Sequence, residues 1–158
     1  MAFRDKVVIV TGAGRGIGQG IAQAYAARGA QVIIAERQRE WGEETERLIK
    51  SQGHGGLFVP TDVGDPQQIV ALMDAVYKRF GAIHILVNNA GVSYVASPYQ
   101  LSVEDWDKVI NINLRGVFLC SREAAKIMRL QNEASIVNIA STRAFQSEEN
   151  SEAYAASK

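Results

Sequence analysis

The sequence has few of the features that define several classes of protein. It has a single cysteine, Cys120, so no disulfide framework can form and we expect a reducing, cytoplasmic compartment. We interpret this cysteine as a small buried residue of a helix. No apolar run approaches the roughly 20 residues of a membrane-spanning helix, and we expect no signal peptide because the N-terminal residues lack an apolar segment.

Neither sign of charge is in excess. Lys plus Arg and Asp plus Glu both number 17 in a chain of 158 residues. A balanced charge provides no basic surface for nucleic acid, and we expect neither a nucleic-acid nor a membrane partner. Apolar residues make up 47%, which is typical of a globular protein. We therefore expect residues 1–158 to form one domain with a hydrophobic core.

Glycine, in contrast, is abundant and is concentrated near the N-terminus. The β-branched run Val7–Thr11 is followed by Gly12, Gly14, Gly16 and Gly18, and apolar residues then recur at helical spacing. A strand that enters a helix through a glycine turn presents free N–H groups and the positive end of the helix dipole at one point. This stretch predicts a phosphate site, and a purely structural turn is the alternative.

The spacing of these glycines is specific. The G-x-G-x-x-G fingerprint is absent, because its third glycine would fall on Ile17, Gln19 or Ile21. Residues 11–18 instead form the pattern T-G-x-x-x-G-x-G.

Short apolar runs alternate with helical patterns along the rest of the chain. We expect strands at 32–35, 57–59, 83–87 and 135–139, and helices at about 40–50, 66–80, 103–130 and from 153 onward. Near-continuous apolar strands joined by helices indicate a doubly wound, Rossmann-type α/β fold with a parallel sheet. Because the crossovers are right-handed, the loops after the strands meet at one edge of the sheet, where ligands bind.

Charged residues follow the second and third strands at this edge. Glu36 ends the second strand, where a carboxylate can accept hydrogen bonds from an adenosine ribose and repels a 2′-phosphate, which favours NAD. Arg37 could pair with that phosphate, so NADP remains possible. Asp62 and Val63 leave the third strand, where the carboxylate can accept from an adenine amino group. Solvated charge at a strand end is the alternative for each of these side chains.

The fourth strand leads into a short polar segment at the same edge. Asn88 can tie neighbouring strand ends together, and Asn89 follows it. Ala90 and Gly91 would let a ribose or a nicotinamide approach the backbone closely. A simple turn is the alternative.

Acid–base chemistry is indicated at the other end of the sequence. Tyr154 and Lys158 are four residues apart and so share one face of a helix. An unperturbed phenol has a pKa of about 10, and its use near neutral pH needs a nearby cation in a low dielectric. Ser141 follows the fifth strand and could donate to a substrate oxygen. In isolation, a surface Tyr–Lys pair is the alternative.

Taken together, these motifs resemble the short-chain dehydrogenase/reductase family, in its single-domain, multi-substrate branch. The resemblance covers the whole chain and implies hydride transfer between a nicotinamide cofactor and a small-molecule alcohol or ketone. Its motifs are residues 11–18, Glu36, Asp62-Val63, Asn88-Asn89-Ala90-Gly91, Asn113-Leu114-Arg115-Gly116, Ser141 and Tyr154-x-x-x-Lys158. The residues implied to bind the cofactor are Gly12, Gly14, Arg15, Gly16, Ile17, Gly18, Glu36, Arg37, Asp62, Val63, Asn89, Ala90, Gly91, Tyr154 and Lys158.

The resemblance also implies catalytic roles. Tyr154 is the general acid/base, and Lys158 lowers the pKa of the phenol and holds the nicotinamide ribose. Ser141 polarises the substrate oxygen. Asn113 bends the long helix and positions a water molecule. Neighbouring residues of the same types that do not keep the family's spacing are Asn111, Ser147 and Ser151.

Complete members of the family continue beyond the lysine. Their later strands, helices and covering loop define the substrate and form the contacts of a homodimer or homotetramer. We therefore expect the chain to be the first part of a longer enzyme, incomplete at its C-terminus. We expect the 158-residue chain alone to bind cofactor weakly and to show little or no turnover. We expect no metal site. The alternatives are an NADPH-dependent carbonyl reductase of the 3-oxoacyl type and a non-catalytic dinucleotide-binding sensor.

Overall fold

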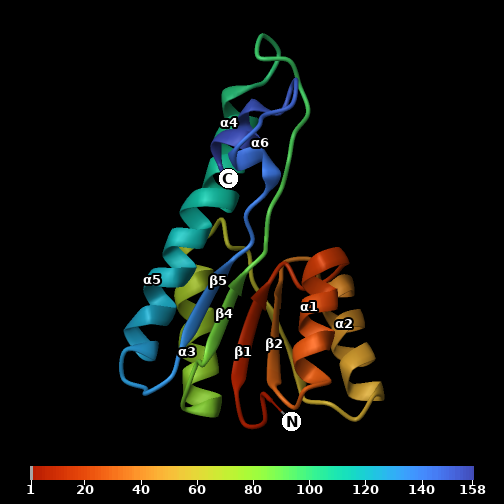
Figure 1. The fold of residues 1–158 in the computed structure, drawn as a ribbon, viewed down its shortest axis with the longest axis vertical. Helices are drawn as coiled ribbons and strands as arrows, with labels where there is room; N and C mark the ends of the chain where they lie inside the picture. Colours follow the sequence, from red (N-terminus) through yellow and green to blue (C-terminus); the bar gives the residue numbers. More distant parts are fainter. Residues whose placement is uncertain (1) are drawn as a thin grey trace.

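Five parallel strands form the centre of the molecule in a computed structural model, which describes residues 2–158 (Figure 1). The strands are β1 (Val7–Thr11), β2 (Gln31–Glu36), β3 (Gly56–Pro60), β4 (Ile85–Asn88) and β5 (Ser135–Asn138). Their order in the sheet is β3-β2-β1-β4-β5. The chain moves outward from β1 to β3 and returns on the other side of β1, so the strand order switches between β1 and β4. The predicted doubly wound sheet is confirmed, and a ligand is expected at this switch.

Helices cover both faces of the sheet. The helical elements are α1 (Gly16–Ala26), α2 (Arg39–Ser51), α3 (Pro66–Phe80), α4 (Val103–Ile110), the π-helical turn η1 (Asn111–Arg115), α5 (Gly116–Met128), the 3₁₀ turn η2 (Thr142–Ala144) and α6 (Glu152–Ala156). Figure 1 shows α1 and α2 on one side of the strands and α3 and α5 on the other. Among residues 2–158, no helix is both long enough and apolar enough to span a bilayer.

The two faces of β1 explain why this strand is apolar along its whole length. Val8 and Val10 belong to the core beneath α1 and α2, whereas Val7 and Ile9 belong to the core beneath α3 and α5. Successive side chains of a strand point to opposite faces, so a strand covered on both sides buries every residue. The buried β1 thus fixes the position from which the glycine turn leaves the sheet.

Cys120 is a residue of α5, packs into the core on the α5 face of the sheet and is almost fully buried. Burial raises the pKa of its thiol to about 12, so the sulfur stays protonated at neutral pH. The interpretation of this cysteine as a core residue is confirmed.

The fourth strand begins at Ile85, two residues later than the sequence pattern predicts. The side chain of Gln131 accepts from the backbone N–H of Ile83 and donates to its carbonyl, both at 2.9 Å. A side chain therefore replaces the expected strand partner at Ile83. Such a long-range contact leaves no periodic trace in the sequence.

The predicted helix over residues 103–130 is interrupted. The π-helical turn η1 separates α4 from α5 and contains Asn113, the residue for which the resemblance implied a bend. At the end of the chain, α6 closes at Ala156 rather than continuing to Lys158.

Candidate active site

The glycine turn after β1 is packed too closely for side chains at most of its glycine positions. A Cβ on Gly18 would lie 2.2 Å from the carbonyl oxygen of Gly12 and 2.4 Å from Nδ2 of Asn89. Gly12 itself has φ +62°, and a Cβ there would lie 2.8 Å from Cα of Ala90. These glycines allow the turn to contact the loop after β4 directly.

Gly16 has a different role in the same turn. Its φ is +57°, yet nothing lies within 4 Å of the place where its Cβ would be. It begins α1, which has no side-chain cap and no acidic residue in its first turn. The first N–H groups of a helix have no intrahelical partner, so this end of α1 offers donors and a positive dipole to an anion. The turn therefore has the form predicted for a phosphate site.

Two polar side chains fasten the turn to the β4 loop. The buried hydroxyl oxygen of Thr11 accepts from the backbone N–H groups of Asn89 and Ala90, at 3.0 and 3.1 Å. The side-chain amide of Asn89 donates in return to the carbonyls of Thr11 and Gly12. Asn89, which the sequence analysis assigned to the cofactor, thus lines the site while its Nδ2 holds the turn in place.

Gly14 is anchored on both sides of its peptide. Its N–H donates to Oε2 of Glu36 at 3.2 Å. Its carbonyl accepts from Gln19 and from Thr45, which is fully buried on α2. Gly14 does not line the cleft described below, so its role is to connect α1, α2 and the end of β2. Sequence reasoning missed Gln19 and Thr45, because each is an ordinary polar residue of a helix.

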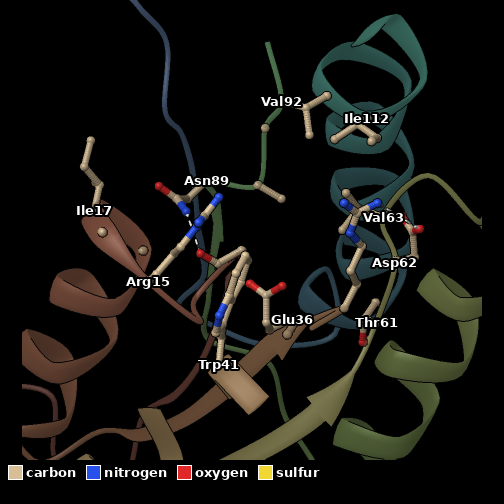
Figure 2. Close-up of a pocket in the computed structure, with 17 residues that line it drawn as sticks. Arg15, Ile17, Glu36, Trp41, Thr61, Asp62, Val63, Asn89, Val92 and Ile112 are labelled. Carbon is tan, nitrogen blue, oxygen red and sulfur yellow. Dashed lines mark hydrogen bonds and ion pairs between the residues drawn. The ribbon is translucent and has the colours of Figure 1, made fainter. Parts of the chain in front are cut away.

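Glu36 is buried, with 8% of its surface exposed. Its Oε1 accepts from the N–H of Gln38 at 2.9 Å, and its Oε2 accepts from Gly14. A carboxylate has about four lone-pair positions. Two are used within the protein, so two remain for further donors. Figure 2 shows the carboxylate pointing into a cleft at the ends of β1, β2 and β4.

This cleft has a volume of about 310 Å³ and lies where the strand order switches. The residues that line it are Gly12, Arg15, Gly16, Ile17, Gly18, Ala35, Glu36, Arg37, Trp41, Thr61, Asp62, Val63, Asn89, Ala90, Gly91, Val92 and Ile112. The cofactor residues implied by the resemblance all appear in this set, except Gly14, Tyr154 and Lys158. The sequence analysis missed Ala35, Trp41, Thr61, Val92 and Ile112.

Trp41 is the largest of the residues missed. The guanidinium of Arg15 lies 4.0 Å from the centre of its ring, and Figure 2 shows the two side chains beside Glu36. This is a cation–π contact between the glycine turn and the first turn of α2. A tryptophan in the charged first half of this helix was a signal for such a contact.

Arg37 and Asp62 form the outer wall of the cleft. Nη1 of Arg37 lies 4.0 Å from Oδ2 of Asp62, and both side chains are partly exposed to solvent. The other oxygen of Asp62 accepts from the N–H of Gly64 at 2.8 Å. The acid and the base that the sequence analysis considered separately are therefore partners of one another.

Three of the residues with implied catalytic roles gather beside Gly91, which lines the cleft. Nζ of Lys158 donates to the carbonyl of Ile139 at 2.9 Å and lies 5.6 Å from the ring centre of Tyr154. A Cβ on Gly91 would lie 3.8 Å from that Nζ and 3.4 Å from Oδ1 of Asn113. The structure thus brings together Asn113, from η1, and Tyr154 and Lys158, from the last segment, beside the backbone of Gly91.

Ser141 lies just after β5, where it begins η2. Its Oγ accepts from the N–H of Arg143 at 3.2 Å. This bond uses a lone pair of the Ser141 oxygen, so the hydroxyl proton is still available to donate to another group.

The residues that do not keep the family's spacing are engaged locally. Ser147 and Ser151 both donate to the carbonyl of Glu148, and Asn111 accepts from Arg115. Within residues 2–158, no group of three or more His, Cys, Asp or Glu side chains is placed to hold a metal ion.

Comparison with known proteins places the chain in a family. The profile of the short chain dehydrogenase family matches residues 6–158, so the chain belongs to that family, as the motifs predicted. An uncharacterised oxidoreductase of Thermotoga maritima is 44% identical over 99% of this chain. The cis-4-hydroxycyclohexanecarboxylate dehydrogenase of Sinomonas cyclohexanicum is 39% identical over 99%. The chain spans 61% and 63% of the lengths of these relatives.

A solved structure has the same fold with a ligand. The short-chain dehydrogenase/reductase from Burkholderia phymatum, in complex with NAD, superposes with a TM-score of 0.95 at 36% identity. The match covers 99% of this chain and 56% of the other.

Proposed function

We propose that the chain supplies the cofactor-binding and acid–base parts of an NAD-preferring oxidoreductase that interconverts an alcohol and a ketone. One observation carries the proposal: Gly91 lines the cleft at the switch in strand order, and the ammonium of Lys158, on the segment that also bears Tyr154, lies beside Gly91. A dinucleotide site and an acid–base pair thus adjoin one another.

The residues of the cleft fit a dinucleotide. The uncapped N-terminus of α1 and the open space at Gly16 suit a pyrophosphate. The two remaining lone-pair positions of Glu36 suit the 2′- and 3′-hydroxyls of an adenosine ribose. Asp62 and Val63 would border the adenine, while Ala90 and Gly91 would border the nicotinamide ribose.

A bound nicotinamide would supply the acceptor or donor of the hydride. The chain's own residues manage the proton. The phenol of Tyr154 gives its proton to the substrate oxygen during reduction and takes it back during oxidation. The positive charge of Lys158 stabilises the phenolate that is left, and the hydroxyl of Ser141 donates to the same substrate oxygen. Asn113 holds the backbone next to the reacting groups.

The preference for NAD follows from the charge and burial of Glu36. A 2′-phosphate would meet a buried carboxylate that two backbone N–H groups hold in place, and the like charges would repel. The NADPH-dependent alternative has support from Arg15 and Arg37 at the rim of the cleft. Both guanidinium groups are already engaged, with Trp41 and Asp62 respectively.

Titration of the full-length protein with NADH and NADPH tests this preference, and Glu36→Gln is the matched variant. Loss of hydrogen bonds to a charged group costs about 1.5–3 kcal/mol, so we expect NADH to bind roughly 10- to 100-fold more weakly to the variant. We also expect its NADPH affinity to rise, because the repulsion is gone. Equal or tighter binding of NADPH by the natural protein would refute the preference.

The substrate class rests on the acid–base pair and on the relatives. The Sinomonas relative is named for a hydroxylated ring substrate. We infer a secondary alcohol or its ketone for this chain, and incubation of the full-length protein with NAD and a panel of such alcohols tests it through the absorbance of NADH. A dinucleotide-binding sensor would produce no NADH with any of them.

We further propose that the full-length protein is a cytoplasmic homodimer or homotetramer. Light scattering of the purified protein measures the assembly, and a monomer would contradict it. Fractionation of cells measures the compartment.

A further inference from the structure

In the sequence, Ser157 lies between Tyr154 and Lys158, the two proposed catalytic residues of the last segment. The family resemblance implies no role for it. It is 5% exposed, and its Oγ lies 2.7 Å from the carbonyl oxygen of Tyr154 and 3.0 Å from Nδ2 of Asn113. A serine hydroxyl has one proton. That proton goes to the carbonyl of Tyr154, so the oxygen must accept from the amide of Asn113. Both interactions of the hydroxyl are thereby fixed in direction.

The amide of Asn113 is fixed in turn. Its Oδ1 accepts from the N–H of Val92 at 2.9 Å, and its Nδ2 donates to the carbonyl of Val92 at 2.9 Å and to Ser157. Both protons of the amide are used. Asn113 is 3% exposed in the π-helical turn η1, so water does not replace a missing partner easily. A flipped amide would turn its oxygen toward the Val92 carbonyl, with no proton available from Ser157.

These bonds form one connected path. It begins at Gly91 and Val92 on the wall of the cleft, passes through Asn113 and reaches Ser157, which is covalently joined to Lys158. Hydrogen bonds between buried groups in a chain hold each other in position. The path connects the place where the nicotinamide ribose is proposed to bind with the segment that bears the acid–base pair.

We propose that Ser157 is a positioning residue: it orients the Asn113 amide and so holds the Gly91-Val92 backbone and the Lys158 ammonium at a fixed separation. This inference rests on the proposed function. The hydroxyl does not touch the substrate. It acts through Asn113 and through the Tyr154 carbonyl, so its loss lets the reacting groups drift apart.

The test compares two serine-to-alanine variants of the full-length protein. Ser157→Ala removes the acceptor of the Asn113 amide. Ser121→Ala is the matched control, because the Oγ of Ser121 also accepts from an asparagine amide, that of Asn88 at 2.9 Å, but lies on α5 outside the path. Both variants lose the same kind of bond, from a buried serine at Ser157 and from a partly buried one at Ser121.

Two measurements are made on each variant. The first is amide hydrogen exchange of Val92 in the cofactor-free protein, and the second is kcat and KM with a saturating nicotinamide cofactor. We expect Ser157→Ala to exchange faster at Val92 and to lose about 10- to 100-fold in kcat, the range for a small misplacement of reacting groups. We expect KM to change much less. Ser121→Ala should keep the exchange rate at Val92 and the kcat of the natural protein.

Two outcomes would overturn the inference. One is unchanged amide exchange at Val92 in the Ser157→Ala variant. The other is a kcat of Ser157→Ala equal to that of Ser121→Ala. If Ser157→Ala does not fold, Ser157→Cys keeps nearly the same volume with a weaker acceptor and should give an intermediate effect in both measurements. Tyr154→Phe, measured in parallel, distinguishes a failure of the proposed function from a failure of the inference about Ser157. If that variant keeps full turnover, the proposed function fails, whereas an unaffected Ser157→Ala beside an inactive Tyr154→Phe removes only the role of Ser157.

Discussion

Replacing Gly18 by alanine tests how tightly the glycine turn packs against the loop after β4. The new Cβ would lie 2.2 Å from the Gly12 carbonyl oxygen and 2.4 Å from Nδ2 of Asn89, both far inside van der Waals contact. The turn or the asparagine must therefore move. Since the Asn89 amide donates to the carbonyls of Thr11 and Gly12, its displacement breaks the bonds that join β1 to β4.

The magnitude follows from three effects. Overpacking of a close-packed site costs about 1–3 kcal/mol. Two lost hydrogen bonds cost about 1 kcal/mol each. The higher helix propensity of alanine offsets about 1 kcal/mol, because Gly18 lies in α1. We expect a net loss of about 2–4 kcal/mol in the free energy of unfolding, which corresponds to a fall in Tm of roughly 4–16 °C for a protein of this size.

Gly20→Ala is the matched control. Gly20 lies in the same helix, and nothing is within 4 Å of the place where its Cβ would be. That variant should gain about 0.5–1 kcal/mol from propensity alone. Urea unfolding followed by circular dichroism measures both variants. If Gly18→Ala is as stable as the natural protein, the close packing of the turn is not a constraint and the reasoning is refuted.

Two further predictions concern polar side chains that accept hydrogen bonds from backbone N–H groups. Burial and, to a lesser extent, the charge of a nearby lysine lower the pKa of His84, whose Nδ1 accepts from the N–H of Val7 at 3.0 Å. The unfolded chain therefore takes up this proton first, so the free energy of unfolding should be fully retained above about pH 6.5 and fall as the pH drops below it. Urea midpoints at successive pH values measure this, and a His84→Gln variant that loses stability over the same pH range to the same extent would contradict it. Thr11→Val should cost about 2–3 kcal/mol, because its isosteric side chain leaves two backbone N–H groups of the β4 loop without an acceptor. It should also weaken NADH binding, since the backbone of Asn89 and Ala90 loses this anchor, and calorimetric titration showing normal affinity would count against that link.

The fold could be predicted from the sequence because its signals are local. The buried run of β1 and the helical spacing after Gly18 each lie within a few residues, and the glycine spacing selects one kind of turn. The helix predicted over residues 66–80 is α3, and Asp65, followed by proline, caps it with a carboxylate that accepts from the N–H of Gln67. Ser102 caps α4 in the same way. Caps and turns obey rules of backbone geometry that single residues reveal.

The features that were missed depend on contacts between distant residues. The sequence indicates no partner for Trp41, whereas in the folded chain the Arg15 guanidinium lies over its ring. The side-chain amide of Gln131, 48 positions along the chain, bonds the backbone of Ile83 in place of a neighbouring strand. Asn89 was assigned to the cofactor, but its Nδ2 also holds the glycine turn. Such partners are set by tertiary packing, and no periodicity in the sequence encodes them.

The central proposal is that Tyr154 moves the proton while the cleft binds a nicotinamide dinucleotide. Turnover of the full-length Tyr154→Phe variant tests it most directly, with NADH affinity measured on the same sample. The phenylalanine keeps the ring near Lys158 and removes only the hydroxyl. We predict that kcat falls by about 10²–10⁴-fold, the usual contribution of a general acid or base, while NADH binds with nearly the natural affinity. Unchanged turnover of this variant would contradict the account.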